Sequence, residues 1–178
     1  DSVRKPASHA GLVGFKPTWG RISRFGLFPF APSLDTIAYF TRDVKDSAYL
    51  LSALAGHDNN DMSTSYRKKE KYERYVEEKK TLHRIGYFKA VVDSMQDEKI
   101  KAAFFDLLEK LRKAGYEVSE YDYPSDLLDA LYPTYMIISC AEATSNNANL
   151  DGVRFGPAAK DNPQTYREYM KECRTKGF

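Results

Sequence analysis

Apolar residues in the first half of this chain recur with helical spacing over residues 44–55. Asp43 occupies the position of an N-cap residue and Gly56 follows the last apolar position. The apolar face consists of Val44, Ala48, Leu51 and Ala55, widened by Leu50 and Leu54. We therefore expect a helix over 44–55, and the polar residues 57–65 after it are typical of a loop.

A strand, a helix and a second strand are predicted between residues 84 and 123. Residues 84–89 and 116–123 are typical of strands, Ser94–Asp97 resembles a capping box, and Gly115 ends the helix. The apolar stripe between them has a period of 3.6 and consists of Ile100, Phe104, Leu107, Leu108 and Leu111. A right-handed crossover makes the two strands parallel and adjacent or nearly so, and the predicted fold class is therefore α/β.

Two more helices are expected in the C-terminal third. Ser125 is a suitable cap for a long apolar helix, in which Pro133 predicts a kink or a break into two helices near 131–132. Asn162–Pro163 has the pattern of an N-cap followed by an N1 proline and predicts the start of the final helix.

The N-terminal 41 residues and residues 66–80 have different patterns. Residues 1–41 are rich in glycine, proline and aromatic residues, which predicts short strands and tight loops and leaves no room for a long helix. Residues 66–80 contain seven Lys or Arg and four Glu, which favours a solvated surface helix with salt bridges.

The composition is that of a globular protein. The chain has 178 residues, 29% charged and 42% hydrophobic, and its net charge of +2 gives no strong case for nucleic-acid binding. No window approaches the roughly 18 consecutive apolar residues that a membrane-spanning helix needs. Cys140 and Cys173 are expected to be buried thiols in a reduced, cytoplasmic setting. The first residue is not Met, and we expect a piece of a longer protein.

Two stretches could carry binding chemistry. Residues 57–61 contain a histidine and two aspartates that could suggest a metal site, although a turn after a helix explains these residue types better. Residues 66–80 combine basic residues with tyrosines, as RNA-binding surfaces do, but a solvated helical face is the favoured interpretation. The sequence contains neither a Walker loop nor a dinucleotide-binding glycine pattern.

The start of the chain carries the most specific motif. Ser2–Ala7 reads serine, aliphatic, arginine, any residue, proline and small residue. Further motifs follow at fixed distances: Gly11–Thr18, Gly20-Arg21, Ser23-Arg24, Gly26-Leu27, Ser33–Asp35, Thr41-Arg42, Gly56–Asp61, Tyr135–Asn146 and Asp151–Gly156. In order and spacing the chain resembles the amidase signature family, and within it the glutamine-hydrolysing subunits of tRNA-dependent amidotransferases. The resemblance implies a mixed sheet flanked by helices, with residues 1–178 forming one partial amidase domain.

The resemblance also implies a catalytic set. Ser2 matches the nucleophile that forms an acyl ester, whereas the bridging serine, the lysine and the oxyanion-hole loop of the family lie upstream of this serine. Asp1 stands where such subunits usually have glycine. Tyr135 matches a tyrosine of the glutamine pocket, although a tyrosine in a helix core is an almost equally good interpretation. Arg4 is expected to anchor the loop rather than to act in catalysis.

The activity implied is hydrolysis of glutamine, which supplies ammonia for converting Glu-tRNA(Gln) to Gln-tRNA(Gln). The implied partners are a B subunit, which uses ATP and Mg²⁺ and holds the tRNA, and a small C subunit; no cofactor is implied for this chain. The 178 residues alone are expected to be inactive. Two alternatives remain open: a stand-alone amidase acting on another carboxamide, and a non-catalytic module in which residues 66–80 bind RNA or a protein partner.

Overall fold

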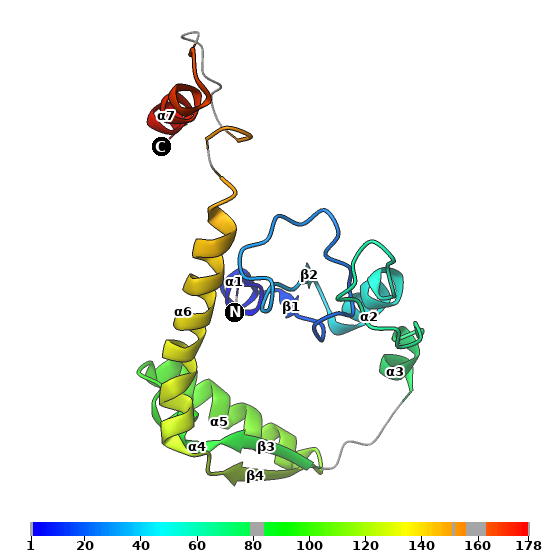
Figure 1. Cartoon of the computed structure of the whole chain (residues 1–178). Coiled ribbons are helices and arrows are strands. Elements are labelled where there is room, and N and C mark those ends of the chain that lie inside the picture. Colours follow the sequence, from blue (N-terminus) through cyan, green and yellow to red (C-terminus); the bar gives the residue numbers. More distant parts are fainter. Residues whose placement is uncertain (1, 79–83, 151, 156–162, 178) are drawn as a thin grey trace. The chain divides into compact units, whose positions relative to one another are not determined.

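The computed structural model describes residues 2–78, 84–150, 152–155 and 163–177 (Figure 1). The chain divides into two compact units, one formed by Asp1–Glu73 and Met136–Phe178 and the other by Arg74–Tyr135. Its elements are α1 (Arg4–Ala10), β1 (Val13–Phe15), β2 (Tyr39–Thr41), α2 (Val44–Leu54), α3 (Glu73–Glu77), β3 (Arg84–Phe88), α4 (Lys89–Asp93), α5 (Glu98–Lys113), β4 (Glu117–Tyr121), α6 (Ser125–Asn147) and α7 (Tyr166–Gly177). The predicted α/β class is confirmed, and the strands among the described residues form two separate two-stranded sheets. In the described part of the chain, no helix combines the length and apolar character needed to cross a membrane.

The first unit contains the antiparallel pair β1–β2 and helix α2. Val13 pairs with Thr41 and Phe15 with Tyr39, whose rings stack with their centroids 5.3 Å apart. The predicted cap of α2 is confirmed, since the Asp43 carboxylate accepts from the Asp46 N–H at 2.8 Å. The helix ends one residue earlier than expected, at Leu54, because the backbone of Ala55 is extended and pairs with Ile22 in an isolated antiparallel bridge.

Helix α1 was not predicted from the sequence. The proline in RKPASHA falls in its first turn, where the missing N–H would have had no helical partner. Gly11 ends the helix with a φ of 66°, a left-handed conformation that glycine adopts without the steric cost of a side chain. The helix is seven residues long, so the expectation that this region holds no long helix is confirmed.

The second unit is the predicted β-α-β arrangement. β3 and β4 are parallel and directly paired, with Arg84 opposite Glu117 and Phe88 opposite Tyr121. The predicted capping box is wrong: α5 starts at Glu98, and Asp97 caps it by accepting from the N–H groups of the second and third helical residues at 2.8 and 3.1 Å. Helix α4, which the sequence did not predict, fills the connection before it.

Residues 66–72 are not helical, so the predicted helix over 66–80 is wrong for them; α3 is short, and 79–83 lie outside the described residues. The carbonyls of Arg67 and Lys68 accept from the guanidinium of Arg21 at 2.9 and 3.4 Å. The Tyr72 N–H, which a helix would direct to the Lys68 carbonyl, donates instead to the Ser52 hydroxyl at 2.7 Å. Tertiary hydrogen bonds therefore replace those that a helix would make.

Helix α6 runs without a break through Pro133, so of the two predicted alternatives the division into two helices is wrong, and the kink stays a prediction. One missing N–H removes a single bond from a helix of 23 residues, and the remaining bonds hold it together. The final helix starts at Tyr166 rather than at the predicted Pro163, and Asn162 lies outside the described residues. Helix α7 starts with a capping box. Thr165 Oγ1 accepts from the Glu168 N–H at 3.2 Å, and the Glu168 carboxylate accepts from the Thr165 N–H at 3.2 Å.

The two cysteines differ in burial. Cys173 on α7 is buried as predicted, whereas Cys140 lies on an exposed side of α6, so the prediction of two buried thiols is wrong for Cys140. Both are free thiols. Residues 57–65 form the predicted loop.

Candidate active site

Ser2 lies in an exposed turn directly before helix α1. The N-cap of the helix is Val3, so the Ser2 hydroxyl does not serve as a helix cap. No hydrogen bond to this hydroxyl is found within the described ranges. Within the described residues, the side chain expected to be the nucleophile is therefore exposed and makes no hydrogen bond.

Strand β1 packs closely against the backbone next to Ser2. A Cβ atom at Gly14 would lie 2.7 Å from the Val3 carbonyl oxygen and 2.7 Å from the Ala7 Cβ, both closer than real contacts allow. Ala7 is buried against this strand, and its N–H donates to the Val3 carbonyl at 3.0 Å. The glycine thus lets β1 pass directly beneath the first turn of α1 and fixes the backbone next to Ser2.

The other two residues that the sequence singled out lie on helix surfaces. Arg4 is exposed in the first turn of α1, and the described contacts give its guanidinium no partner, so its anchoring role stays a prediction. Tyr135 lies on α6, half exposed, with its ring 6.4 Å from that of Tyr132. Ser2 and Tyr135 belong to different compact units.

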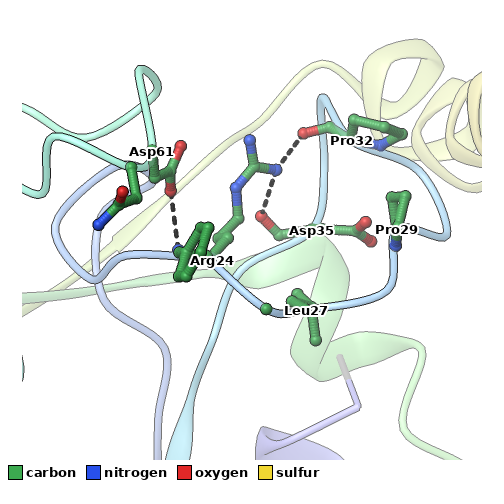
Figure 2. Close-up of a pocket in the computed structure, with 9 residues that line it drawn as sticks. Arg24, Leu27, Pro29, Pro32, Asp35 and Asp61 are labelled. Atoms are coloured by element: carbon green, nitrogen blue, oxygen red, sulfur yellow. Dashed lines mark hydrogen bonds between the residues drawn. The ribbon is translucent and has the colours of Figure 1, made fainter.

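A pocket of about 270 Å³ lies in the first unit, between the loop of residues 24–35 and the turn at Asn60-Asp61 (Figure 2). Its wall combines apolar side chains with Arg24 and two aspartates; the lining residues are Arg24, Phe25, Gly26, Leu27, Pro29, Pro32, Asp35, Asn60 and Asp61. Ser2 and Tyr135 do not line it. Sequence reasoning did not predict this pocket, although three of the motifs that carry the family resemblance supply its polar residues.

Arg24 organises the pocket. Its guanidinium donates to the carbonyls of Pro32 and Asp35, the latter at 3.2 Å, and to the Ser63 hydroxyl at 3.0 Å, and it lies 4.8 Å from the Trp19 ring centre. The Asp35 carboxylate accepts from two backbone N–H groups of the same loop, at 2.9 and 3.2 Å. The polar groups of the pocket thus hold its own loop in shape, which indicates a structural role.

Hydrogen bonds from nearby residues to Asp58 and Asp61 hold the turn at 57–61, which supports its interpretation as a turn. The Ser63 hydroxyl and N–H and the Arg24 N–H donate to Asp61 and lower the pKa of that carboxyl to about 2. The Ser23 hydroxyl donates to Asp58 at 2.6 Å and lowers the pKa of that carboxyl as well. Within the described ranges, no cluster of three or more His, Cys, Asp or Glu residues is arranged to hold a metal ion.

The C-terminal half of α6 is tied to the same loop. The Glu142 carboxylate accepts from the N–H of Ser33 at 3.0 Å and from its hydroxyl, and these bonds lower the pKa of Glu142. The Asn146 amide donates to the Phe30 carbonyl at 3.3 Å. These contacts fix the loop of the pocket against α6 within the first unit.

Comparison with known proteins links these residues to one family. The Amidase family model matches residues 1–178. Two proteins named as the A subunit of glutamyl-tRNA(Gln) amidotransferase are similar to the chain: that of Brevibacillus brevis is 40% identical over 177 residues and that of Halothermothrix orenii 39% over 181 residues. Each alignment covers 99% of this chain and 36% of the relative, so the chain spans about a third of the length of these relatives.

Two crystal structures are similar to the chain. The A subunit of glutamyl-tRNA(Gln) amidotransferase from Thermotoga maritima matches with a TM-score of 0.70 and 34% identity, covering 83% of this chain and 32% of that one. An amidase family protein from Bacillus anthracis matches with a TM-score of 0.57 and 30% identity, covering 69% of this chain and 25% of that one. The sequence motifs and the backbone therefore point to the same family.

Proposed function

The chain belongs to the amidase family, and on this basis we propose that it is part of a glutamine-hydrolysing subunit of a tRNA-dependent amidotransferase. The observation that carries the proposal is the match of Ser2–Ala7 to the family's serine motif, with Ser2 in the turn before α1 and the backbone next to it packed against Gly14. The relatives that carry the name of glutamyl-tRNA(Gln) amidotransferase, at about 40% identity, support this choice of branch.

In the proposed reaction, Ser2 is the nucleophile. Its Oγ attacks the side-chain carboxamide carbon of glutamine, its proton passes to a base, and the resulting tetrahedral oxyanion is held by backbone N–H donors. Collapse of this intermediate breaks the C–N bond, ammonia leaves with a proton from the base, and a Ser2 acyl ester remains. Water then hydrolyses the ester to glutamate and free Ser2.

The base is supplied from outside the matched motif. A serine hydroxyl is a weak nucleophile until a neighbour takes its proton, and a lysine kept neutral by burial can do so through a second serine. None of the residues in this sequence matches the lysine or the bridging serine of the family. In the proposal, these groups belong to the complete protein, of which residues 1–178 form one partial amidase domain.

Tyr135 is proposed to line the glutamine pocket of the complete protein. It lies half exposed on α6, so its hydroxyl and ring face are accessible to a ligand. The ammonia released would pass to a B subunit that activates Glu-tRNA(Gln) with ATP and Mg²⁺, with a C subunit bracing the heterotrimer. The proposal places the complex in the cytoplasm, and both free thiols are compatible with this.

Substrate choice distinguishes this proposal from a stand-alone amidase. We expect the complete protein to release ammonia from glutamine, more strongly when its partner subunits are present, and to leave aryl and fatty amides intact. The measurement is ammonia release with each amide at equal concentration, with and without the partners. Turnover of aryl or fatty amides without partners, and none of glutamine, would contradict the proposal and favour the stand-alone amidase.

A further inference from the structure

Residues 66–72, which we call the basic segment, have no role in the proposed reaction. Four of these seven residues are Lys or Arg and one is Glu. The segment is not helical, so the solvated surface helix that would account for its charges is absent from it. A different explanation is needed for a row of cations on a backbone that tertiary contacts hold in place.

Arg21 holds the basic segment from inside the protein. Its side chain is 8% exposed, and its guanidinium donates to the carbonyls of Arg67 and Lys68 and to the hydroxyl of Tyr72. The neighbouring Gly20 packs against the residues just before the segment: a Cβ there would lie 2.6 Å from the Ser63 carbonyl oxygen, and its own carbonyl accepts from the Ser65 N–H at 2.8 Å. A buried cation thus fixes the backbone from which the exposed cations project.

The last turn of helix α2 also holds the segment, through two hydrogen bonds. Lys69 donates to the Ala53 carbonyl at 2.9 Å, a favourable place for a cation at a helix C-terminus. The Ser52 hydroxyl accepts from the Tyr72 N–H at 2.7 Å. With both ends attached, the segment would lose little backbone entropy on binding a partner.

The remaining groups of the segment face solvent. The Arg67 side chain is 73% exposed and makes only a long contact of 3.7 Å with Glu70, while Lys68 and Lys71 are exposed. Tyr66 is 79% exposed and stacks on His57 with ring centroids 4.0 Å apart, so its outer face is open. A rigid aromatic face beside three cations is the combination that binds a stacked base and the phosphates next to it.

We propose that the basic segment binds single-stranded RNA, with Tyr66 stacking on a base and Arg67, Lys68 and Lys71 contacting phosphates. In single-stranded RNA each nucleotide carries both a base that can stack on an open tyrosine ring and a phosphate that pairs with a cation, so one ligand would use both features of the segment. The preceding turn contains two carboxylates, Asp58 and Asp61. Both accept hydrogen bonds from neighbouring residues and thereby stabilise the turn; the donors are Ser23, Arg24 and Ser63. The inference is independent of the proposed function.

Binding is tested with the complete protein and a labelled 12-nucleotide uridine-rich RNA, by fluorescence anisotropy between 50 and 200 mM salt. We expect the triple variant Arg67→Gln, Lys68→Gln, Lys71→Gln to bind more weakly and to reduce the slope of log K against log salt by about 2, since each phosphate contact contributes roughly 0.7. Tyr66→Ala should weaken binding on the order of tenfold without changing that slope.

A charge-matched triple variant on α5, Lys99→Gln, Lys110→Gln, Lys113→Gln, is the control and should leave RNA binding unchanged. Equal losses in both triple variants would overturn the proposal, because general charge would then explain the binding. A wild-type protein that does not bind the RNA at 50 mM salt would also overturn it. A third outcome would also overturn the proposal: a poly-glutamate peptide competes as well as RNA does, and Tyr66→Ala has no effect on RNA binding. The surface would then suit an acidic protein.

Discussion

At the scale of single residues, Gly14 determines where the backbone beside Ser2 can lie. The missing side chain lets β1 approach the Val3 carbonyl and the Ala7 methyl group closely. Two of the three nearest atoms to an added Cβ are backbone atoms, which cannot rotate away as a flexible side chain can. This position therefore couples the stability of the fold to the geometry of the proposed nucleophile.

Gly14→Ala is expected to lower the free energy of unfolding by about 1–3 kcal/mol, because overpacking forces the first turn of α1 away from β1. Urea unfolding of the complete protein measures this change. Ser8→Ala, an exposed change on the same helix, is the control and should stay within about 0.5 kcal/mol of wild type. Equal stabilities of the Gly14 variant and the control would show that the close packing is not maintained in solution.

Asp61 makes the folding stability of the first unit depend on pH in the acidic range. Hydrogen bonds from Ser63 and Arg24 lower its folded-state pKa to about 2, below the roughly 3.9 of an unfolded chain. Its ionised form therefore stabilises the folded state above about pH 4, and this contribution is lost as the pH falls from there toward about 2.

Asp61→Asn should lower stability at pH 6 and flatten the loss of stability between pH 4 and pH 2. Urea midpoints across this range measure both effects. Asp129→Asn, which removes an exposed carboxyl on α6, is the control and should keep the wild-type acid profile. An Asp61 variant with the wild-type acid profile would contradict the assigned hydrogen bonds.

At the scale of elements, the start of α5 depends on Asp97 rather than on Ser94. The Asp97 carboxylate accepts from the first free N–H groups of the helix, whereas the Ser94 hydroxyl donates to the Val91 carbonyl at the end of α4. Both residues are exposed and three positions apart, which makes them a matched pair.

Asp97→Ala is expected to reduce stability by about 1 kcal/mol, the usual effect of losing an N-cap, while Ser94→Ala should change it by less than about 0.5 kcal/mol. Thermal unfolding of both variants measures the difference. A larger loss of stability for Ser94→Ala than for Asp97→Ala would contradict the observed start of α5. It would favour the capping box at Ser94 that the sequence predicted.

The sequence predicted elements whose signals are local. α2 with its Asp43 cap follows from periodicity and capping, and the parallel pair β3–β4 follows from the strand–helix–strand pattern and the right-handed crossover rule. The basic segment could not be predicted in this way, because its conformation depends on Arg21, some 46 residues earlier in the chain. Helix α1 was missed because Pro6 and the glycines nearby indicate loops unless the proline is known to fall in a first turn.

The candidate site was predictable to a similar extent. The serine motif identified Ser2 from residue order and spacing, and the structure places it in an exposed turn. The close packing at Gly14 and the pocket around Arg24 depend on contacts between segments that are distant in sequence, so no local pattern indicates them.

At the scale of the whole molecule, the 178 residues correspond to about a third of the length of the relatives. Under the proposed mechanism they carry the nucleophile without a residue matched to its base. We therefore expect the isolated 178-residue chain to release no ammonia from glutamine above background, because an unactivated serine hydroxyl is a poor nucleophile.

A coupled glutamate dehydrogenase assay of the purified 178-residue chain tests this expectation. The complete protein, assayed in parallel, is the positive control. Ammonia release by the short chain at a rate near that of the complete protein would show that residues 1–178 contain their own base, and the proposed division of the catalytic set would be wrong.

The most direct test of Ser2 as the nucleophile is the rate of ammonia release from glutamine by the complete protein carrying Ser2→Ala. We predict that the rate falls by several orders of magnitude, as it does when other serine nucleophiles are removed, and that no acyl ester is trapped on the Ser2 peptide by mass spectrometry. Ser8→Ala, six residues further on, should keep the wild-type rate. A Ser2→Ala protein that turns over glutamine at the wild-type rate would contradict the assignment of Ser2.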